Sequence, residues 1–217
     1  MGARRWLAQY DSDVAPSLEP YPNRTLLDYL RQLAADRPSA PALLFKGRTI
    51  TYAELERDSH ALARAFHEMG IRKGDRVALV LPNCPQFLVA EFAAWKLGAI
   101  VVPLNPTYSE RELQHALDAT GAGTVVVLSL YYQRVKSVQA NTSVRQVVAT
   151  SIKEYLPAHL KLLFTLAVEK KEGDRVTVAP GDYDLATLVK KYRGRPFQRA
   201  ALTPDDPAVL TFYMVVN

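Results

Sequence analysis

The sequence has almost no cysteine: Cys84 is the only one in 217 residues. A single thiol excludes an internal disulfide, and such sparing use is typical of proteins kept in the reducing cytoplasm. Cys84 lies where the N-cap of a helix is expected, and no nearby residue in the sequence offers itself as a base. We therefore interpret it as a packed structural thiol, in preference to a nucleophile.

Long apolar runs are also missing. No uninterrupted stretch approaches the roughly 18 residues that cross a bilayer as a helix. Residues 1–6 contain two arginines, but no apolar segment or cleavage site follows them, which argues against a signal peptide. We expect a cytoplasmic protein, with peripheral membrane contact left open.

Glycine is scarce, with ten residues where average usage would give about fifteen. Neither of the two common glycine-rich phosphate-binding loops is present. The four histidines show no spacing typical of metal ligands, and surface positions on one helix explain His60 and His67. The four are His60, His67, His115 and His159. On these residues alone, the chain has no visible active site.

Positive charge predominates, with a net charge of +5. Most of the excess lies in residues 151–199, where ten lysines and arginines face six acids, a difference of +4. The basic residues are interleaved with acids and follow no aromatic pattern. We therefore predict a solvated surface and no nucleic-acid partner.

Against these absences, residues 76–117 show a clear pattern of strand, helix, strand and helix. Residues 77–81 are continuously apolar, as in a strand covered on both faces. Pro85 then opens a helix that is apolar nearly all round, so we expect it to be sandwiched. Residues 100–103 form a second strand, and Ser109 with Glu112 forms a capping box for the next helix. Such a βαβα unit predicts a parallel sheet.

The preceding residues predict a helix, a hairpin and a second helix. Thr25 caps the first helix, whose expected inner face is Leu26, Leu30 and Leu33. Residues 41–52 have the pattern of a hairpin with a Lys-Gly turn. Thr51 and Glu54 then form a capping box for a helix that Gly70 ends, and its expected buried stripe is Leu55, Ser59, Leu62, Phe66 and Met69.

The alternation continues after the central unit. Strands are expected at residues 124–128 and 144–149, with a helix at 131–140 between them. Regular alternation from residue 76 to residue 150 indicates an α/β fold with a doubly wound open sheet.

From Ser151 onward the character of the chain changes. A basic amphipathic helix is expected after Pro157, with Leu156, Leu160, Leu163 and Ala167 on one side. Residues 171–174 are interpreted as a loop, and residues 184–192 as a short helix. The apolar run at 208–216 is expected to form a buried strand.

Ligands of open α/β sheets bind beyond the carboxyl ends of the strands, so the loops there were searched for chemistry. The loop at residues 81–85 contains Cys84 but no glycine for an anion-binding nest. In the loop at 104–108, Asn105 and Tyr108 could touch a ligand, although Asn-Pro is an ordinary turn pair. No catalytic, cofactor-binding or metal-binding residue is assigned.

Five blocks, in order and spacing, resemble the adenylate-forming superfamily, which includes acyl-CoA synthetases and luciferases. They are Ile50–Leu55, Gly74–Ala78, Leu81–Asn83, Trp95–Ala99 and Val102–Pro106. Residues 155–173 and 205–210 are most similar to bacterial long-chain fatty acid–CoA ligases. The resemblance covers residues 25–213.

The resemblance implies an ATP-dependent reaction. A carboxylate attacks the α-phosphate of ATP to give an acyl-adenylate and pyrophosphate, and the thiol of CoA then displaces AMP. The implied cofactors of the whole enzyme are ATP, Mg²⁺ and CoA, and the implied partners are a fatty acid, ATP and CoA. In the family, the strand that corresponds to residues 208–213 runs into a glycine-rich phosphate-binding loop. This sequence stops before that loop, so no family catalytic residue can be carried onto it.

We therefore expect residues 1–24 to be an extended arm and residues 25–217 to be a partial AMP-binding domain, a truncated N-terminal subdomain of the adenylate-forming fold. The expected function is that of an N-terminal fragment of a long-chain fatty acid–CoA ligase, inactive alone and binding none of the cofactors well. The alternative is a non-catalytic protein that binds a partner or a membrane through its basic amphipathic segment. Homodimerisation is left open.

Overall fold

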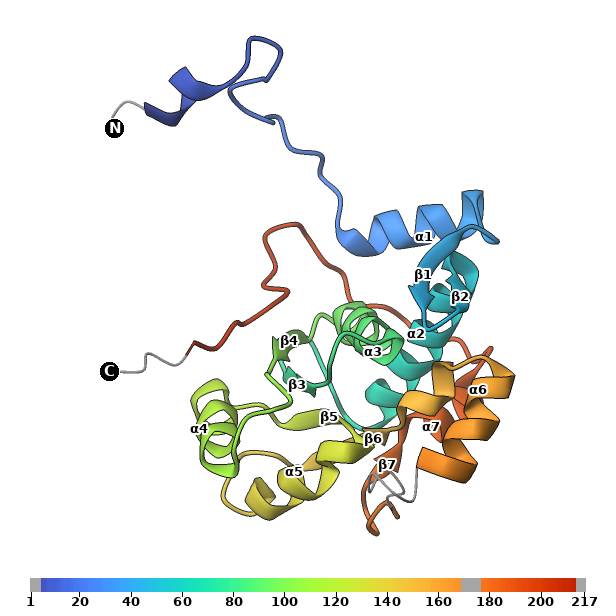
Figure 1. Cartoon of the computed structure of the whole chain (residues 1–217). Coiled ribbons are helices and arrows are strands. Elements are labelled where there is room, and N and C mark those ends of the chain that lie inside the picture. The colour runs from blue at the N-terminus through green and yellow to red at the C-terminus, as the bar shows by residue number, and fades with distance from the viewer. Residues whose placement is uncertain (1–4, 169–176, 214–217) are drawn as a thin grey trace.

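The computed structural model of the chain describes residues 5–168 and 177–213 (Figure 1). Its centre is a parallel sheet of five strands in the order β4-β3-β5-β6-β7. The strands are β3 (Arg76–Val80), β4 (Ile100–Pro103), β5 (Thr124–Leu128), β6 (Gln146–Thr150) and β7 (Tyr183–Asp184). The predicted open α/β sheet is confirmed, and the short β7 is an addition that the sequence did not indicate.

Helices lie on both sides of this sheet. They are α1 (Leu26–Asp36), α2 (Tyr52–Glu68), α3 (Pro85–Lys96), α4 (Glu110–Thr120), α5 (Tyr132–Gln139), α6 (Ala158–Leu163) and α7 (Leu185–Tyr192). Within the described residues, no helix has the length and apolar character needed to cross a bilayer.

Two separate apolar cores hold the layers together. Alternate residues of β3 point to opposite faces, as the period of a strand requires. Val77 and Leu79 pack with α2, α3 and α7, whereas Ala78 and Val80 pack with α4 and α5. Every residue of β3 after Arg76 is buried, which explains why the sequence shows an unbroken apolar run there.

The helix starts follow the sequence closely. Both predicted capping boxes are present, at Thr51 and Ser109. Thr25 caps α1 as predicted, and it also forms a capping box with Asp28 that was not predicted. The buried stripe of α2 is as expected except that Met69 is only half-buried. For α1 the predicted face was wrong at Leu26, which is 61% exposed. Leu30 is buried as predicted, Leu33 is half-buried, and the neighbouring Leu27 is buried in place of Leu26.

The predicted hairpin is also present. It comprises β1 (Pro41–Phe45) and β2 (Arg48–Thr51), which pair antiparallel. Lys46 and Gly47 both have positive φ, of 46° and 82°, so the turn has the left-handed backbone that suits a two-residue hairpin.

The expectation that α3 would be sandwiched was only half right. Val89, Ala90, Ala93 and Ala94 are fully buried against the sheet and α2. Its outer face, which includes Phe92 and Trp95, is only partly covered. Nearly continuous apolar character therefore did not mean burial all round.

The apolar run at 208–216 does not form the predicted buried strand. In its described part, a single parallel bridge joins Val209 to Val101 of β4, and Val209 is 45% exposed. The bridge lies beside β4, the outermost strand of the sheet. Residues 214–216 lie outside the described residues.

The basic amphipathic helix is present as α6 and a π-helical turn, Phe164–Val168. None of the residues of α6 is buried within the chain. Leu156, just before the helix, is the residue of the predicted apolar side that is buried. The side chain of Ala167 and the predicted loop at 171–174 lie outside what the structure describes.

The segment before α1 extends away from the body (Figure 1). Residues Arg5–Gln9 form a 3-10 helix in which no residue is buried. The remainder up to Arg24 has no regular helix or strand.

Leu79 gives a direct test of the central core. Leu79→Ala removes methyl groups from a fully buried position in β3, so we expect a loss of about 2–5 kcal/mol in the free energy of unfolding. Leu44→Ala is the matched control, because Leu44 is 78% exposed and its truncation should change stability by roughly 0.5 kcal/mol or less. Urea unfolding of both variants measures the difference. Equal losses would contradict the placement of the core.

Candidate functional site

The carboxyl edge of the sheet is where a ligand is expected. The strand after β3 in sequence, β4, lies on one side of β3, and the later strands lie on its other side. In such sheets, a ligand-binding crevice opens at this switch point, here between β3 and β5. Here Tyr131, the last residue of the 3-10 turn that follows β5 (Ser129–Tyr131), is half-buried and packs against both apolar cores.

The loop after β3 ends at Cys84. The thiol is free and buried, and it makes no capping hydrogen bond to α3. Burial raises the pKa of Cys84, although the amides of Phe87 and Gln86 act in the opposite direction. The thiol therefore stays protonated and a poor nucleophile near neutral pH, which confirms the structural interpretation.

An apolar groove of about 310 Å³ opens beside this loop. It lies between the hairpin and the first turn of α3. Its lining residues are Leu43, Leu44, Phe45, Asn83, Cys84, Pro85, Phe87 and Leu88. No acid, base or cation is among them, so the groove could hold an apolar group but offers no chemistry.

The loop after β4 is a turn. The side-chain oxygen of Asn105 accepts hydrogen bonds from the amide and hydroxyl of Thr107, at 3.0 and 2.8 Å. The carbonyl of Tyr108 accepts from Arg134 at 2.9 Å. Asn105 is thus engaged locally, as turn-forming asparagines usually are.

The segment after β6 carries a titratable cluster that sequence inspection missed. Burial raises the pKa of Glu154 to about 7. Hydrogen bonds from the Ser151 amide and the Thr150 hydroxyl act in the opposite direction and lower this pKa. Next to Glu154, the hydroxyl of Tyr155 donates to Asp58 at 3.2 Å, and burial raises the pKa of Tyr155. Only the Ser-x-x-Glu capping spacing could have pointed to Glu154.

A second buried cluster centres on Lys96, whose side chain is fully buried in α3. Its ammonium donates to Glu56 at 2.8 Å and to the hydroxyl of Ser59 at 2.5 Å, and Arg199 also pairs with Glu56. Desolvation lowers the pKa of Lys96 from 10.5 to about 8, although Glu56 opposes this. Lys96 lines none of the three cavities described here; its hydrogen bonds join α3 to α2.

The histidines take no part in a metal site. Among the described residues, no three His, Cys, Asp or Glu side chains are placed to hold an ion. His60 and His67 are half-buried and lie against Phe197, with ring centroids 4.8 and 6.5 Å apart. Their predicted surface positions were therefore only partly right, because the strand-less segment around Phe197 folds over them.

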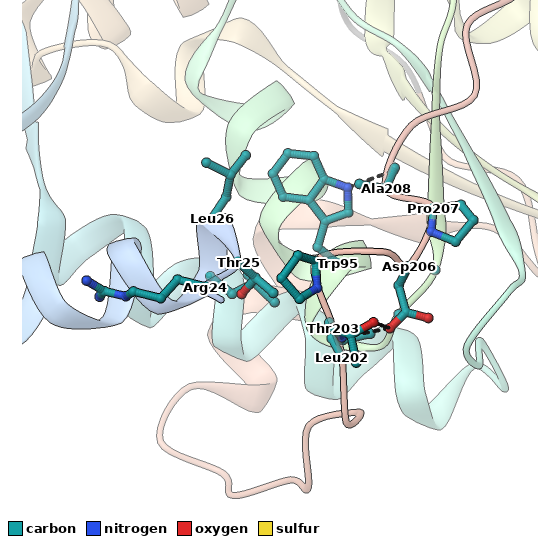
Figure 2. A pocket seen from close by; sticks show the side chains of 13 residues that line it. Arg24, Thr25, Leu26, Trp95, Leu202, Thr203, Asp206, Pro207 and Ala208 are labelled. Carbon is teal, nitrogen blue, oxygen red and sulfur yellow. Dashed lines mark hydrogen bonds between the residues drawn. The ribbon is translucent and has the colours of Figure 1, made fainter. Parts of the chain in front are cut away.

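A further cavity, of about 230 Å³, lies at the start of α1 (Figure 2). Trp95 forms one wall, and its ring nitrogen donates to the carbonyl of Ala208 at 2.8 Å. Opposite lie Thr25 and Leu26, as Figure 2 shows. Gly98 and Ala99, which precede β4, complete its floor, so the cavity belongs to the amino edge of the sheet, remote from the expected ligand position.

Comparison with protein families and characterised proteins gives a consistent result. Residues 30–212 match the model of the AMP-binding enzyme family. The chain is 36% identical over 208 residues to a long-chain-fatty-acid–CoA ligase of Bacillus subtilis, which covers 95% of the chain and 37% of that enzyme. It is 29% identical to 4-coumarate–CoA ligase 2 of rice over 91% of the chain and 33% of that enzyme. The chain thus spans about a third of the length of these relatives.

Solved structures show the same fold. A long-chain-fatty-acid-CoA ligase from Archaeoglobus fulgidus superposes with a TM-score of 0.66 at 22% identity, over 89% of this chain and 35% of that one. A benzoate CoA ligase from Burkholderia xenovorans gives 0.65 at 19% identity, over 84% and 31%.

Lys96 should make the free energy of unfolding change with pH in the alkaline range. Its folded-state pKa is below its unfolded one, so between about pH 8 and pH 10.5 the unfolded chain binds more protons. Stability should then rise with pH by up to about 1.4 kcal/mol per pH unit from this group. We expect the rise from pH 8 to 9.5 in urea unfolding of the wild type, and its loss in Lys96→Met. An identical pH dependence in both proteins would contradict this.

Proposed function

Because this chain belongs to the family of AMP-binding enzymes, we propose that it is the N-terminal portion of a long-chain fatty acid–CoA ligase. The observation that carries the proposal is 36% identity to the Bacillus subtilis ligase over 95% of the chain. Similar identity to a ligase of Escherichia coli, 36% over 210 residues, supports it. The substrates of the whole enzyme would be a long-chain fatty acid, ATP and CoA.

Within that enzyme, the proposed role of this chain is structural. Tyr131, which follows β5, packs against both apolar cores, and Asp58 and Glu56 are already engaged in ion pairs. These residues do not fit a nucleotide with Mg²⁺, so no reaction step is assigned to them. We propose that none of the residues of this chain is catalytic and that the isolated chain binds ATP, Mg²⁺ and CoA poorly.

The domain division follows from the same proposal. Residues 1–24 would be an arm and residues 25–217 a partial AMP-binding domain. The alternative of a non-catalytic protein finds no support in the comparisons, which match ligases. A cytoplasmic location remains our proposal, supported by the single cysteine.

A chimeric enzyme tests the assignment. In the Bacillus subtilis ligase, the part that matches this chain would be replaced by residues 1–217. We expect the chimera to form palmitoyl-CoA from palmitate, ATP and CoA, because the chain would supply an equivalent scaffold. A chimera that carries Leu79→Asp should be inactive, since a charge in β3 prevents packing.

The isolated chain is the second arm of this experiment. We expect no ATP–pyrophosphate exchange from it with palmitate and Mg²⁺. Exchange by the chain alone would contradict its structural role. A folded chimera without activity would contradict the ligase assignment.

We also propose peripheral membrane contact through α6 and the turn that follows it. Leu162, Leu163 and Leu166 are exposed there, and Lys161 adds a positive charge near them. Apolar and basic residues together favour binding to an anionic bilayer surface.

Vesicle co-sedimentation measures this contact. The chain should pellet with phosphatidylglycerol vesicles, and Leu162→Gln/Leu166→Gln should reduce the bound fraction severalfold. Leu44→Gln on the hairpin is the matched control and should bind as the wild type. Absence of wild-type binding would contradict the contact. Sedimentation equilibrium on the same samples tests homodimerisation.

A further inference from the structure

A polar hollow of about 280 Å³ lies at the amino edge of the sheet, opposite to the carboxyl edge where ligands of such folds bind. We call it the amino-edge hollow. It is bounded by the residues that precede β3, β5 and β6 and by the ends of α2 and α4. The lining residues used below are Asp75, Arg76, Gly121, Gly123, Ser143 and Arg145.

Two exposed arginines line this hollow. Among the described residues, neither Arg76 nor Arg145 makes a side-chain hydrogen bond or ion pair, so both guanidinium groups are solvated and available to an added anion. Their neighbours behave differently. Arg72 donates to the carbonyls of His67 and Ile71, at 2.7 and 2.9 Å, and Lys73 pairs with Asp206 at 2.7 Å.

The backbone makes room for both guanidinium groups. A Cβ at Gly121 would lie 2.9 Å from a terminal nitrogen of Arg76, and one at Gly123 would lie 2.9 Å from a terminal nitrogen of Arg145. Gly121 is also required by its positive φ of 62°. Gly123 has no positive φ, so its backbone conformation does not require glycine. Its missing side chain instead leaves space for the guanidinium group of Arg145.

Negative groups near the hollow are partly engaged in hydrogen bonds. The carboxyl ends of α2 and α4 carry partial negative charge, and the Met69 carbonyl there accepts from Gln146 at 2.8 Å. The amide of Gly121 binds the carbonyls of Leu117 and Asp118 in α4. Asp75, the one acid of the lining, accepts from the Arg72 amide at 2.8 Å and pairs with neither arginine.

We propose that the amino-edge hollow binds a phosphate-type oxyanion between Arg76 and Arg145. Guanidinium groups present pairs of N–H donors that match phosphate oxygens. The hydroxyl of Ser143 adds a third donor, because it has no hydrogen bond within the described residues. The volume accommodates phosphate or the terminal phosphates of a larger molecule.

Isothermal titration of the whole chain at low ionic strength tests the proposal, with inorganic phosphate, pyrophosphate and ATP as separate probes. We expect measurable binding of at least one probe, weakened by added salt. Tighter binding of ATP than of pyrophosphate would identify a nucleotide as the source of the phosphate, and the reverse order a free anion.

Variants separate the site from general surface charge. Arg76→Gln/Arg145→Gln should weaken binding at least tenfold. Arg111→Gln is the matched control, since Arg111 is exposed on α4 about 15 Å along the helix from Gly121, and it should leave binding unchanged. No wild-type binding of any probe, or equal weakening by all variants, would overturn the proposal.

Gly123→Ala provides a test that keeps both charges. Its methyl group would meet only the flexible end of Arg145, so the chain should fold as before, which circular dichroism and thermal unfolding verify. The displaced guanidinium should weaken binding severalfold. Unchanged affinity in this folded variant would show that the hollow is not the binding site. Because the ligase chimera does not depend on this hollow, failure here leaves that proposal untouched.

Discussion

Burial of β3 on both faces is the constraint on which the rest of the structure depends. Parallel strands are joined by crossover helices, and these helices cover both faces of the sheet with apolar side chains. Val77 and Leu79 face one layer, while Ala78 and Val80 face the other. Each helix of the central unit therefore has its place fixed by which face of β3 it covers.

The irregular C-terminal third is attached to this frame by charges. Two acids of α2 make most of these contacts. Asp58 accepts a hydrogen bond from Tyr155 and pairs with Arg193. Glu56 forms ion pairs with Lys96 and Arg199. On the other face, Asp182 accepts from the hydroxyl of Tyr132 at 2.5 Å. These polar contacts add to the apolar packing of α7, whose Leu185, Leu188 and Val189 belong to the same core as Val77 and Leu79. Such ion pairs cost desolvation, as the lowered pKa of Lys96 shows.

The function follows from membership of the family more than from any visible site. The blocks that resemble adenylate-forming enzymes are the strands, caps and turns of a scaffold, and Trp95–Ala99 includes the buried Lys96 that joins α3 to α2. The most polar cavity of those described lies at the amino edge of the sheet, away from the edge where chemistry is expected in such folds. The proposed anion site is thus separate from the proposed ligase reaction.

The sequence by itself determined the central fold, because its signals are local. Continuous apolar strands, capping boxes at Thr51 and Ser109 and helix-ending glycines act over a few residues, and all lie where predicted. Only the tertiary structure decided which apolar residues are covered, as Leu26 and Val209 show. It also decided the hollow between Arg76 and Arg145, which are distant in the chain, because a cavity depends on where separate strands begin in space. Hydrophobic pattern gives the type of an element, whereas burial and charge pairing depend on its neighbours.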